Sequence, residues 1–250
     1  MKFFGFLSGV LFSALFATSA VATDLTDLTD EERRAFREEV RAYLLANPEL
    51  LVEAINVLEQ RQARDLALAE VRMLEDNSRA IYEDPASYVG GNPEGDIVMV
   101  EFLDYRCSFC RRAHDEVNEL ITSDGNIKII VKEYPILGDE SVLASRFAIA
   151  TLQTEGPEAY KQVNDALMLM RTSVTQAALA RLGRQFDLDV DKILEVMDTE
   201  EVSSVIEANY ELGRRMQVTG TPTFIFGEQI VRGYVPLDGM RQMVEEIRTN

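Results

Sequence analysis

The first part of the chain has a helical pattern, because apolar residues recur at every third or fourth position between residues 24 and 82. This spacing is typical of one face of an α-helix, and no alternating strand pattern interrupts it. Near its start, Thr29 stands three residues before Glu32, which is the spacing of a capping box. We therefore predict one helix over about 30–46 and a second over about 48–80.

The two predicted helices meet at Asn47-Pro48, a pair that is typical of an N-cap followed by the first helical residue. Acidic and basic residues alternate along the second helix, as they do on an exposed, ion-paired face. This N-terminal helical extension, residues 23–82, has two interpretations. It folds back on the main domain, or it is an oligomerisation stalk whose apolar stripe is buried against other copies of the chain.

The pattern changes beyond the extension. Residues 83–96 are rich in proline and glycine and predict a linker or turn region. The apolar run Ile97–Leu103 then predicts a buried strand, residues 107–120 a helix and residues 127–131 a second strand. A strand-helix-strand unit of this length implies that the two strands are parallel.

Residues 139–217 are helical throughout, and their breaks predict four segments. The segments are about 139–155, 157–170, 174–186 and 189–216, the last with a break near Thr199. Two strands follow as a hairpin across Gly227-Glu228, and an amphipathic helix over about 236–248 closes the chain. The fold class is therefore α/β: a domain over residues 83–250 with a helical insertion at about 138–217.

The first 22 residues resemble a secretory signal peptide. Lys2 supplies a positive start, an apolar stretch follows, and Ala20-Val21-Ala22 forms a small-x-small cleavage site. An uncleaved membrane anchor is the alternative, but glycines and serines dilute the apolar stretch and favour cleavage after Ala22. We expect an exported protein, and in bacteria a periplasmic one, in a compartment where disulfides form and persist.

The amino-acid composition excludes several classes of protein. An apolar fraction of 46% argues against a disordered chain. The 43 acidic residues outnumber the 25 basic ones, and the net charge of −18 becomes −19 when Lys2 leaves with the signal. Such a surface argues against a nucleic-acid partner and against binding to anionic membranes.

Two cysteines and one histidine cannot form a disulfide scaffold or complete a tetrahedral zinc site without a carboxylate. We expect neither a cofactor nor a metal.

The two cysteines stand in the motif Cys107-Ser108-Phe109-Cys110, between a predicted strand and the start of a predicted helix. Free N–H groups and the positive helix end favour a thiolate there, and the thiolate is the nucleophile in disulfide exchange. We expect Cys107 to be the exposed attacking thiol and Cys110 the resolving one. A static disulfide and a metal half-site are the alternatives. His114 is one turn further on, and a surface histidine is favoured there over a ligand.

A second motif is Gly220-Thr221-Pro222-Thr223-Phe224. A proline at the start of a strand cannot donate to the ladder, so it requires a sheet edge or an unusual bond. An X-Pro bond is the place where a cis peptide is tolerated. The residues by themselves establish a proline at the entry to a strand.

Together, residues 100–110 and 220–224 resemble the DsbA-like thiol-disulfide oxidoreductases of bacterial envelopes. The resemblance covers residues 88–250 and implies a thioredoxin fold interrupted by a helical domain. It implies that Cys107 and Cys110 are the active pair and that Pro222 is cis beside them, preceded by Thr221. It also implies that Glu101 is the buried acid under the site.

A desolvated carboxylate near Cys110 would have a raised pKa and could relay the proton of the resolving thiol. This role for Glu101 is favoured over a salt bridge at a strand edge. The dipeptide between the cysteines is Ser-Phe and lacks the histidine of strong oxidants, which can donate to the thiolate. We therefore expect a less acidic Cys107 than in those proteins, although the charge of Arg106 would favour the thiolate if it lies close.

The extension resembles the copper-sensitivity-suppressor C proteins and related multimeric disulfide isomerases, through residues 39–51. Some members of that group are trimers that shuffle disulfides, so the resemblance implies a homo-oligomer, as a trimer, through residues 23–82.

The predicted function is an exported thiol-disulfide oxidoreductase, an isomerase or oxidase of envelope proteins. Its partners would be cysteine-containing clients and a redox protein that recycles the two thiols. One alternative is a periplasmic copper-tolerance protein that holds Cu(I) between Cys107 and Cys110. A second is a noncatalytic binding module, against which the retained cysteine pair argues.

Overall fold

The computed structural model describes residues 28–249, and the predicted signal peptide lies outside this range. The chain divides into two compact units, the first ending at Arg61 and the second beginning at Gln62. Helix α1 spans Asp30–Ala46 and helix α2 spans Glu49–Tyr82. The capping box of α1 is confirmed, with the Glu32 amide donating to Thr29 Oγ1 at 3.3 Å and the Thr29 amide donating to Glu32 Oε2 at 2.9 Å.

The predicted start of the second helix is wrong in its detail. Asn47 is the C-cap of α1, and both its backbone N–H and its side-chain amide donate to the Tyr43 carbonyl. The side chain therefore satisfies a carbonyl at the end of one helix and does not cap the next. None of the described helices has a stretch both long and apolar enough to cross a membrane.

The second unit is built on a five-stranded sheet in the order β1-β3-β2-β4-β5. Strands β2 and β3 are parallel, as predicted, and every other neighbouring pair is antiparallel. The strands span Tyr88–Gly91 (β1), Ile97–Leu103 (β2), Ile127–Glu133 (β3), Thr223–Phe226 (β4) and Gln229–Arg232 (β5). The hairpin predicted across Gly227-Glu228 is confirmed as β4 and β5.

Strand β1 lies inside the segment predicted to be a linker. It pairs with β3 from Tyr88 opposite Val131 to Gly91 opposite Lys128. The two glycines of β1 hide its pattern, because they bring no side chains whose alternation could reveal a strand. A residue far away in the sequence also holds this strand, since the Tyr88 ring stacks on Tyr160 with 4.5 Å between the ring centroids.

Within residues 28–249, seven helices surround the sheet, and five of them, α4 to α8, form the insertion between β3 and β4. The seven helices are α3 (Ser108–Asp124), α4 (Asp139–Glu155), α5 (Pro157–Leu169), α6 (Gln176–Gln185), α7 (Val190–Val196), α8 (Glu200–Arg215) and α9 (Leu237–Thr249). The insertion therefore contains five helices, because the last predicted segment is divided into α7 and α8. The division falls at Thr199, whose hydroxyl accepts from the Val202 amide and so starts a new helix.

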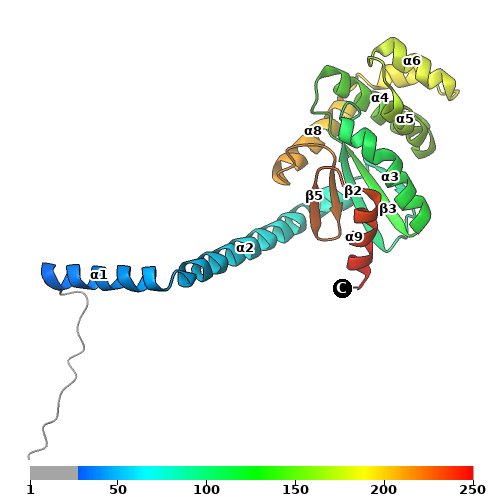
Figure 1. Cartoon of the computed structure of the whole chain (residues 1–250). Helices are drawn as coiled ribbons and strands as arrows, with labels where there is room; N and C mark the ends of the chain where they lie inside the picture. Colours follow the sequence, from blue (N-terminus) through cyan, green and yellow to red (C-terminus); the bar gives the residue numbers. More distant parts are fainter. Residues whose placement is uncertain (1–27, 250) are drawn as a thin grey trace, which may run out of the picture. The chain divides into compact units, whose positions relative to one another are not determined.

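The central strand β2 is buried on both faces, as its unbroken apolar run predicted. Met99 and Leu103 face a core that includes α3 and α9, and these two helices flank the strands in Figure 1. Val100 and Phe102 face the opposite core, which contains the end of α2 and part of α8. The last part of α2 thus packs within the second unit, and the predicted domain boundary at residue 82 stays a prediction.

Candidate active site

The two cysteines lie where β2 ends and α3 begins. Cys107 is the N-cap residue of α3 and Cys110 lies in its first turn, and both are free thiols. The Cys107 amide donates to the Asp104 carbonyl at 3.0 Å, which fixes the loop between strand and helix. The backbone thus presents the sulfur of Cys107 to the free N–H groups and the positive end of α3.

Cys107 is more enclosed than the sequence suggested, since 7% of it is exposed, against 0% of Cys110. A segment far away in the sequence covers it: in the thiol form, Cys107 Sγ donates to the Thr221 carbonyl at 3.0 Å, across 114 residues of chain. Pairing of β2 with β4 brings this loop to the cysteines, and the Thr221–Pro222 peptide bond is cis. Residues of both sequence motifs therefore meet at one place.

The two thiols differ strongly in acidity. A hydrogen bond from Cys110 is the largest influence that lowers the pKa of Cys107, to about 5, and it acts against burial. The side chain of Thr221 and the backbone N–H groups of Cys110 and Phe109 lower it further by hydrogen bonding. Burial, followed by the bond to Cys107, raises the pKa of Cys110 far above its ordinary value. At neutral pH this geometry holds a thiolate at Cys107 and a protonated thiol at Cys110.

Glu101 lies in the middle of the central strand, on the face toward α3, and is buried. Among the described residues it makes no ion pair, so the alternative of an edge salt bridge is wrong. Burial, and then the charge of Glu133, raise its pKa to about 8. Its charge in turn raises the pKa of Cys110, which places the carboxyl within electrostatic reach of the resolving thiol.

A second buried acid, Glu133, escaped the sequence analysis because the predicted strand stopped at Val131. The carboxyl of Glu133 accepts hydrogen bonds of 2.6 Å from three hydroxyl groups: those of Tyr105, Tyr160 and Ser145. Burial raises its pKa to about 7 although these three bonds lower it. The parallel register places Glu133 opposite Leu103 and two residues beyond the partner of Glu101, so the two acids share one face of the sheet.

His114 is buried, which corrects the prediction of a surface histidine. Its Nε2 lies 2.7 Å from Asp165 Oδ1 on α5, a residue that no local pattern placed nearby. Together with Glu101, Asn118 and Lys161 it lines a cavity of about 390 Å³. In the part of the chain that the structure describes, no group of three or more His, Cys, Asp or Glu side chains could hold a metal ion.

Comparison with known proteins agrees with this geometry. The thioredoxin family model matches residues 83–246, and a model described as the copper resistance protein ScsC N-terminal domain matches residues 32–64. Among solved structures, a thioredoxin-like oxidoreductase from Silicibacter pomeroyi is 34% identical, with a TM-score of 0.64 over 69% of this chain and 98% of that one. A ScsC variant from Proteus mirabilis is 25% identical, with a TM-score of 0.66 over 92% of this chain and 99% of that one.

Some curated relatives match over only a short part of their own length. The Na(+)/H(+) antiporter NhaA 3 of Salinispora tropica is 26% identical over 137 residues, which are 55% of this chain and 21% of that protein. This chain thus spans about a fifth of the length of that relative. The thioredoxin match covers the sheet and both cysteines, and the ScsC match covers most of α1 and part of α2. The chain therefore belongs to the thioredoxin family, in the DsbA-like subgroup that contains ScsC.

Proposed function

We propose that the protein is an exported thiol-disulfide oxidoreductase that acts on disulfides of periplasmic proteins. The observation that carries this proposal is the contrast between the cysteines: an acidic Cys107 at the start of α3 beside a buried, protonated Cys110. One thiol is activated as a nucleophile, while its neighbour stays protonated until it resolves the mixed disulfide. The signal-like residues 1–22 support export.

In the proposed reaction, the Cys107 thiolate attacks one sulfur of a client disulfide. A bond forms between Cys107 and that sulfur, and the client's other sulfur leaves as a thiolate with the electron pair of the broken bond. A client thiolate can then attack the client sulfur of the mixed disulfide, which forms a new disulfide within the client and releases the Cys107 thiolate. Alternatively, Cys110 attacks the sulfur of Cys107. In the second case a Cys107–Cys110 disulfide forms and the client leaves reduced.

Attack by Cys110 requires that its thiol lose a proton in a buried place. We propose that Glu101 accepts this proton, because the two groups are coupled electrostatically and the carboxyl has a pKa of about 8, near the working pH. Thr221 and Pro222 would border the client strand, because the Thr221 carbonyl already contacts Cys107 Sγ. The reduced form would be restored, or the oxidised form regenerated, by a redox partner.

The experiment that tests this function is the recovery of ribonuclease activity from ribonuclease with scrambled disulfides. The reduced protein should accelerate the recovery well above the rate with glutathione buffer alone. A sample whose reactive thiol has been alkylated is the control, since its nucleophile is blocked. Equal rates with and without the reduced protein would contradict the proposal.

We also propose that the first unit joins copies of the chain into a homo-oligomer, with three copies as the expectation. Helix α1 contains no buried residue, and several of its apolar side chains are largely exposed. Five apolar residues line a hollow of about 410 Å³ on α1 and the start of α2: Phe36, Val40, Leu44, Leu45 and Leu51. An apolar surface of this kind is stabilised when another copy covers it. Several active sites on one particle would favour isomerisation of a misfolded client.

Charged substitutions in this hollow are expected to dissociate the oligomer. We expect Val40→Asp with Leu44→Asp to yield monomers, because each buried carboxylate would lie unpaired in an apolar interface. The measurement is the molar mass by light scattering of the full chain. Glu38→Gln, on an exposed position of the same helix, is the control and should leave the mass unchanged. A monomeric wild-type protein would contradict the proposal.

A further inference from the structure

Several arginines lie near Cys107, although the chain as a whole is acidic. The chain carries a net charge of −18, yet arginines stand on both sides of Cys107 in the sequence, at Arg106 and Arg111. A third, Arg171, comes from the loop that follows α5. That loop lies against the active-site loop, because Arg106 Nη1 donates to the Thr172 carbonyl at 3.4 Å.

Arg106 is already paired, since its Nε lies 3.2 Å from the Glu140 carboxylate. Arg111 is different. Its backbone amide donates to the Cys107 carbonyl at 3.1 Å, so it stands one helical turn above the nucleophile, and its Nε donates to the Tyr105 carbonyl at 2.7 Å. Its Nη2 is enclosed and has no hydrogen-bond partner among the described residues. Every other buried side-chain nitrogen or oxygen in residues 28–249 has one.

Arg111 lies near other positive charges and, among the described residues, forms no salt bridge. Burial, and then repulsion from Arg106 and Arg171, lower the pKa of Arg111, while the charges of Asp104 and Cys107 act in the opposite direction. The Asp104 carboxylate is occupied, because it accepts from four groups: the amides of Arg106, Ile136 and Leu137 and the hydroxyl of Ser141. Arg171 is exposed and has no ion pair among the described residues.

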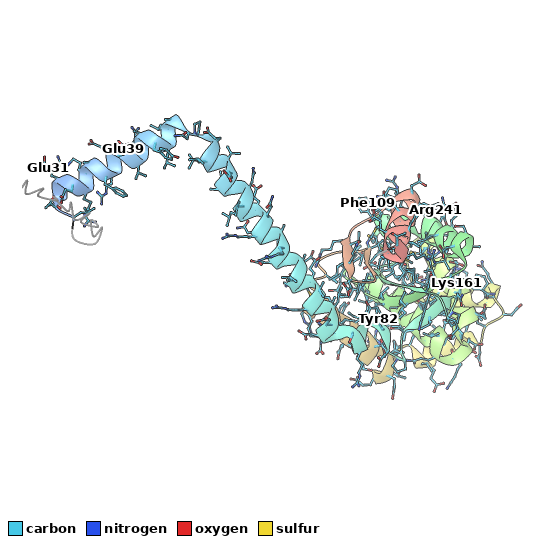
Figure 2. The ribbon with its side chains drawn as sticks, turned by 90° about the horizontal axis from the view of Figure 1, so that it is seen from below. Glu31, Glu39, Tyr82, Phe109, Lys161 and Arg241 are labelled. Carbon is cyan, nitrogen blue, oxygen red and sulfur yellow. The ribbon has the colours of Figure 1, made fainter. Side chains whose placement is uncertain are left out.

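The same segments of the chain carry exposed apolar side chains. Phe109, between the cysteines, is 55% exposed and lies at the surface in Figure 2. Leu137 is 53% exposed on the loop held by Asp104, and Leu169 is 61% exposed two residues before Arg171. Aromatic side chains and arginines are enriched at protein-binding surfaces.

We propose that Arg111 and Arg171 recognise a carboxylate on the client peptide beside its reacting cysteine, while Phe109, Leu137 and Leu169 contact its apolar residues. This proposal rests on the proposed function and assigns a client class to it: segments in which an acidic residue flanks the cysteine. A guanidinium binds a carboxylate through two parallel hydrogen bonds. Because Nη2 has no partner in the free protein, a small movement of Arg111 toward the client gains a bond and breaks none at that atom.

The acidity of the rest of the chain does not oppose this preference at physiological salt. Charges there are screened over about 8 Å, so distant carboxylates act weakly on a client at the active site. Arginines in contact with the client carboxylate are screened much less. The local sign of the charge therefore decides which client segments are preferred.

The test uses three peptides that differ in one residue next to their cysteine: Glu, Gln or Lys. Each cysteine carries a thiopyridine group as a disulfide. The Cys107 thiolate attacks the peptide sulfur, a Cys107–peptide disulfide forms, and thiopyridine leaves with the electron pair and is measured by absorbance. At physiological salt we expect the wild-type rate to fall from Glu to Gln to Lys, by about threefold to tenfold at each step.

The ratio of the Glu rate to the Gln rate separates recognition from nucleophile reactivity, because any change in the Cys107 thiolate cancels in it. Arg171→Met and Arg111→Met should each bring this ratio toward one. Arg171 is exposed, so its variant remains informative even if Arg111→Met affects folding. Arg241→Met, which removes the same charge from α9 where Arg241 pairs with Glu119, should leave the ratio unchanged.

Equal wild-type rates for the three peptides would overturn this inference and leave the proposed function intact. So would a Glu-to-Gln ratio that survives both arginine substitutions. A wild-type protein that releases thiopyridine from none of the peptides would overturn the proposed function, and this inference with it.

Discussion

Replacing Cys107 by serine is expected to reduce ribonuclease reactivation to the uncatalysed rate, a loss of at least about a hundredfold. The thiolate of Cys107 is the proposed attacking group, with a pKa lowered to about 5. A serine hydroxyl at the same place is un-ionised at neutral pH and does not attack disulfides. Cys110 cannot take over the role, because burial keeps it protonated and raises its pKa far above neutrality.

The matched control is Cys110→Ser, which keeps the attacking thiol and removes the resolving one. It should accumulate a covalent complex with the client through Cys107, visible as a band on a non-reducing gel that disappears on reduction. Cys107→Ser should give no such band. Reactivation by Cys107→Ser at the wild-type rate would refute the assignment of Cys107 as nucleophile.

Glu101→Gln is expected to stabilise the fold, by about 3 kcal/mol at pH 7. The folded-state pKa of Glu101 is about 8, against 4.5 for an exposed glutamate, because burial disfavours its charge. The group is ionised in the unfolded chain and protonated in the folded one between these values, so folding must take up a proton. Its contribution to stability is therefore complete below pH 4.5 and is lost as pH rises through about 8.

The measurement is urea unfolding of both proteins as a function of pH. The difference between them should be near zero below pH 4.5, grow as pH rises and level off above about 8. Glu245→Gln, at an exposed position, should show no such rise. A difference that is constant with pH would contradict a raised pKa at Glu101.

The same substitution should harm the reaction that the acid is proposed to serve. Without a proton acceptor, attack of Cys110 on the Cys107 mixed disulfide should slow by about a hundredfold at neutral pH. The wild-type rate of this step should rise as Glu101 loses its proton near pH 8, and the rise should be absent in the variant. A stabilised but slow variant would show that this carboxyl lowers stability where it assists the reaction.

Local patterns were sufficient where the structure depends on neighbouring residues. The spacing of Thr29 and Glu32 predicted the helix start, and the apolar run Ile97–Leu103 predicted a doubly buried strand. They failed where the partner is distant in sequence. Strand β1 depends on pairing with β3 and on the Tyr88–Tyr160 stack, neither of which has a local signal. Asn47 is a different case, because it is compatible with a cap of either helix and its partner, the Tyr43 carbonyl, is four residues away.

The amino-acid sequence is sufficient to identify the reactive groups: two cysteines in one motif, a strand-entry proline at residue 222 and an acid at residue 101, in an α/β order that resembles the DsbA-like proteins. How these groups act on one another depends on the folded chain. The pKa of a thiol or carboxyl depends on burial and on charges within a few ångströms. Those surroundings come from segments far apart in the chain: Thr221 over Cys107, Glu133 beside Glu101 and Arg171 near Arg111.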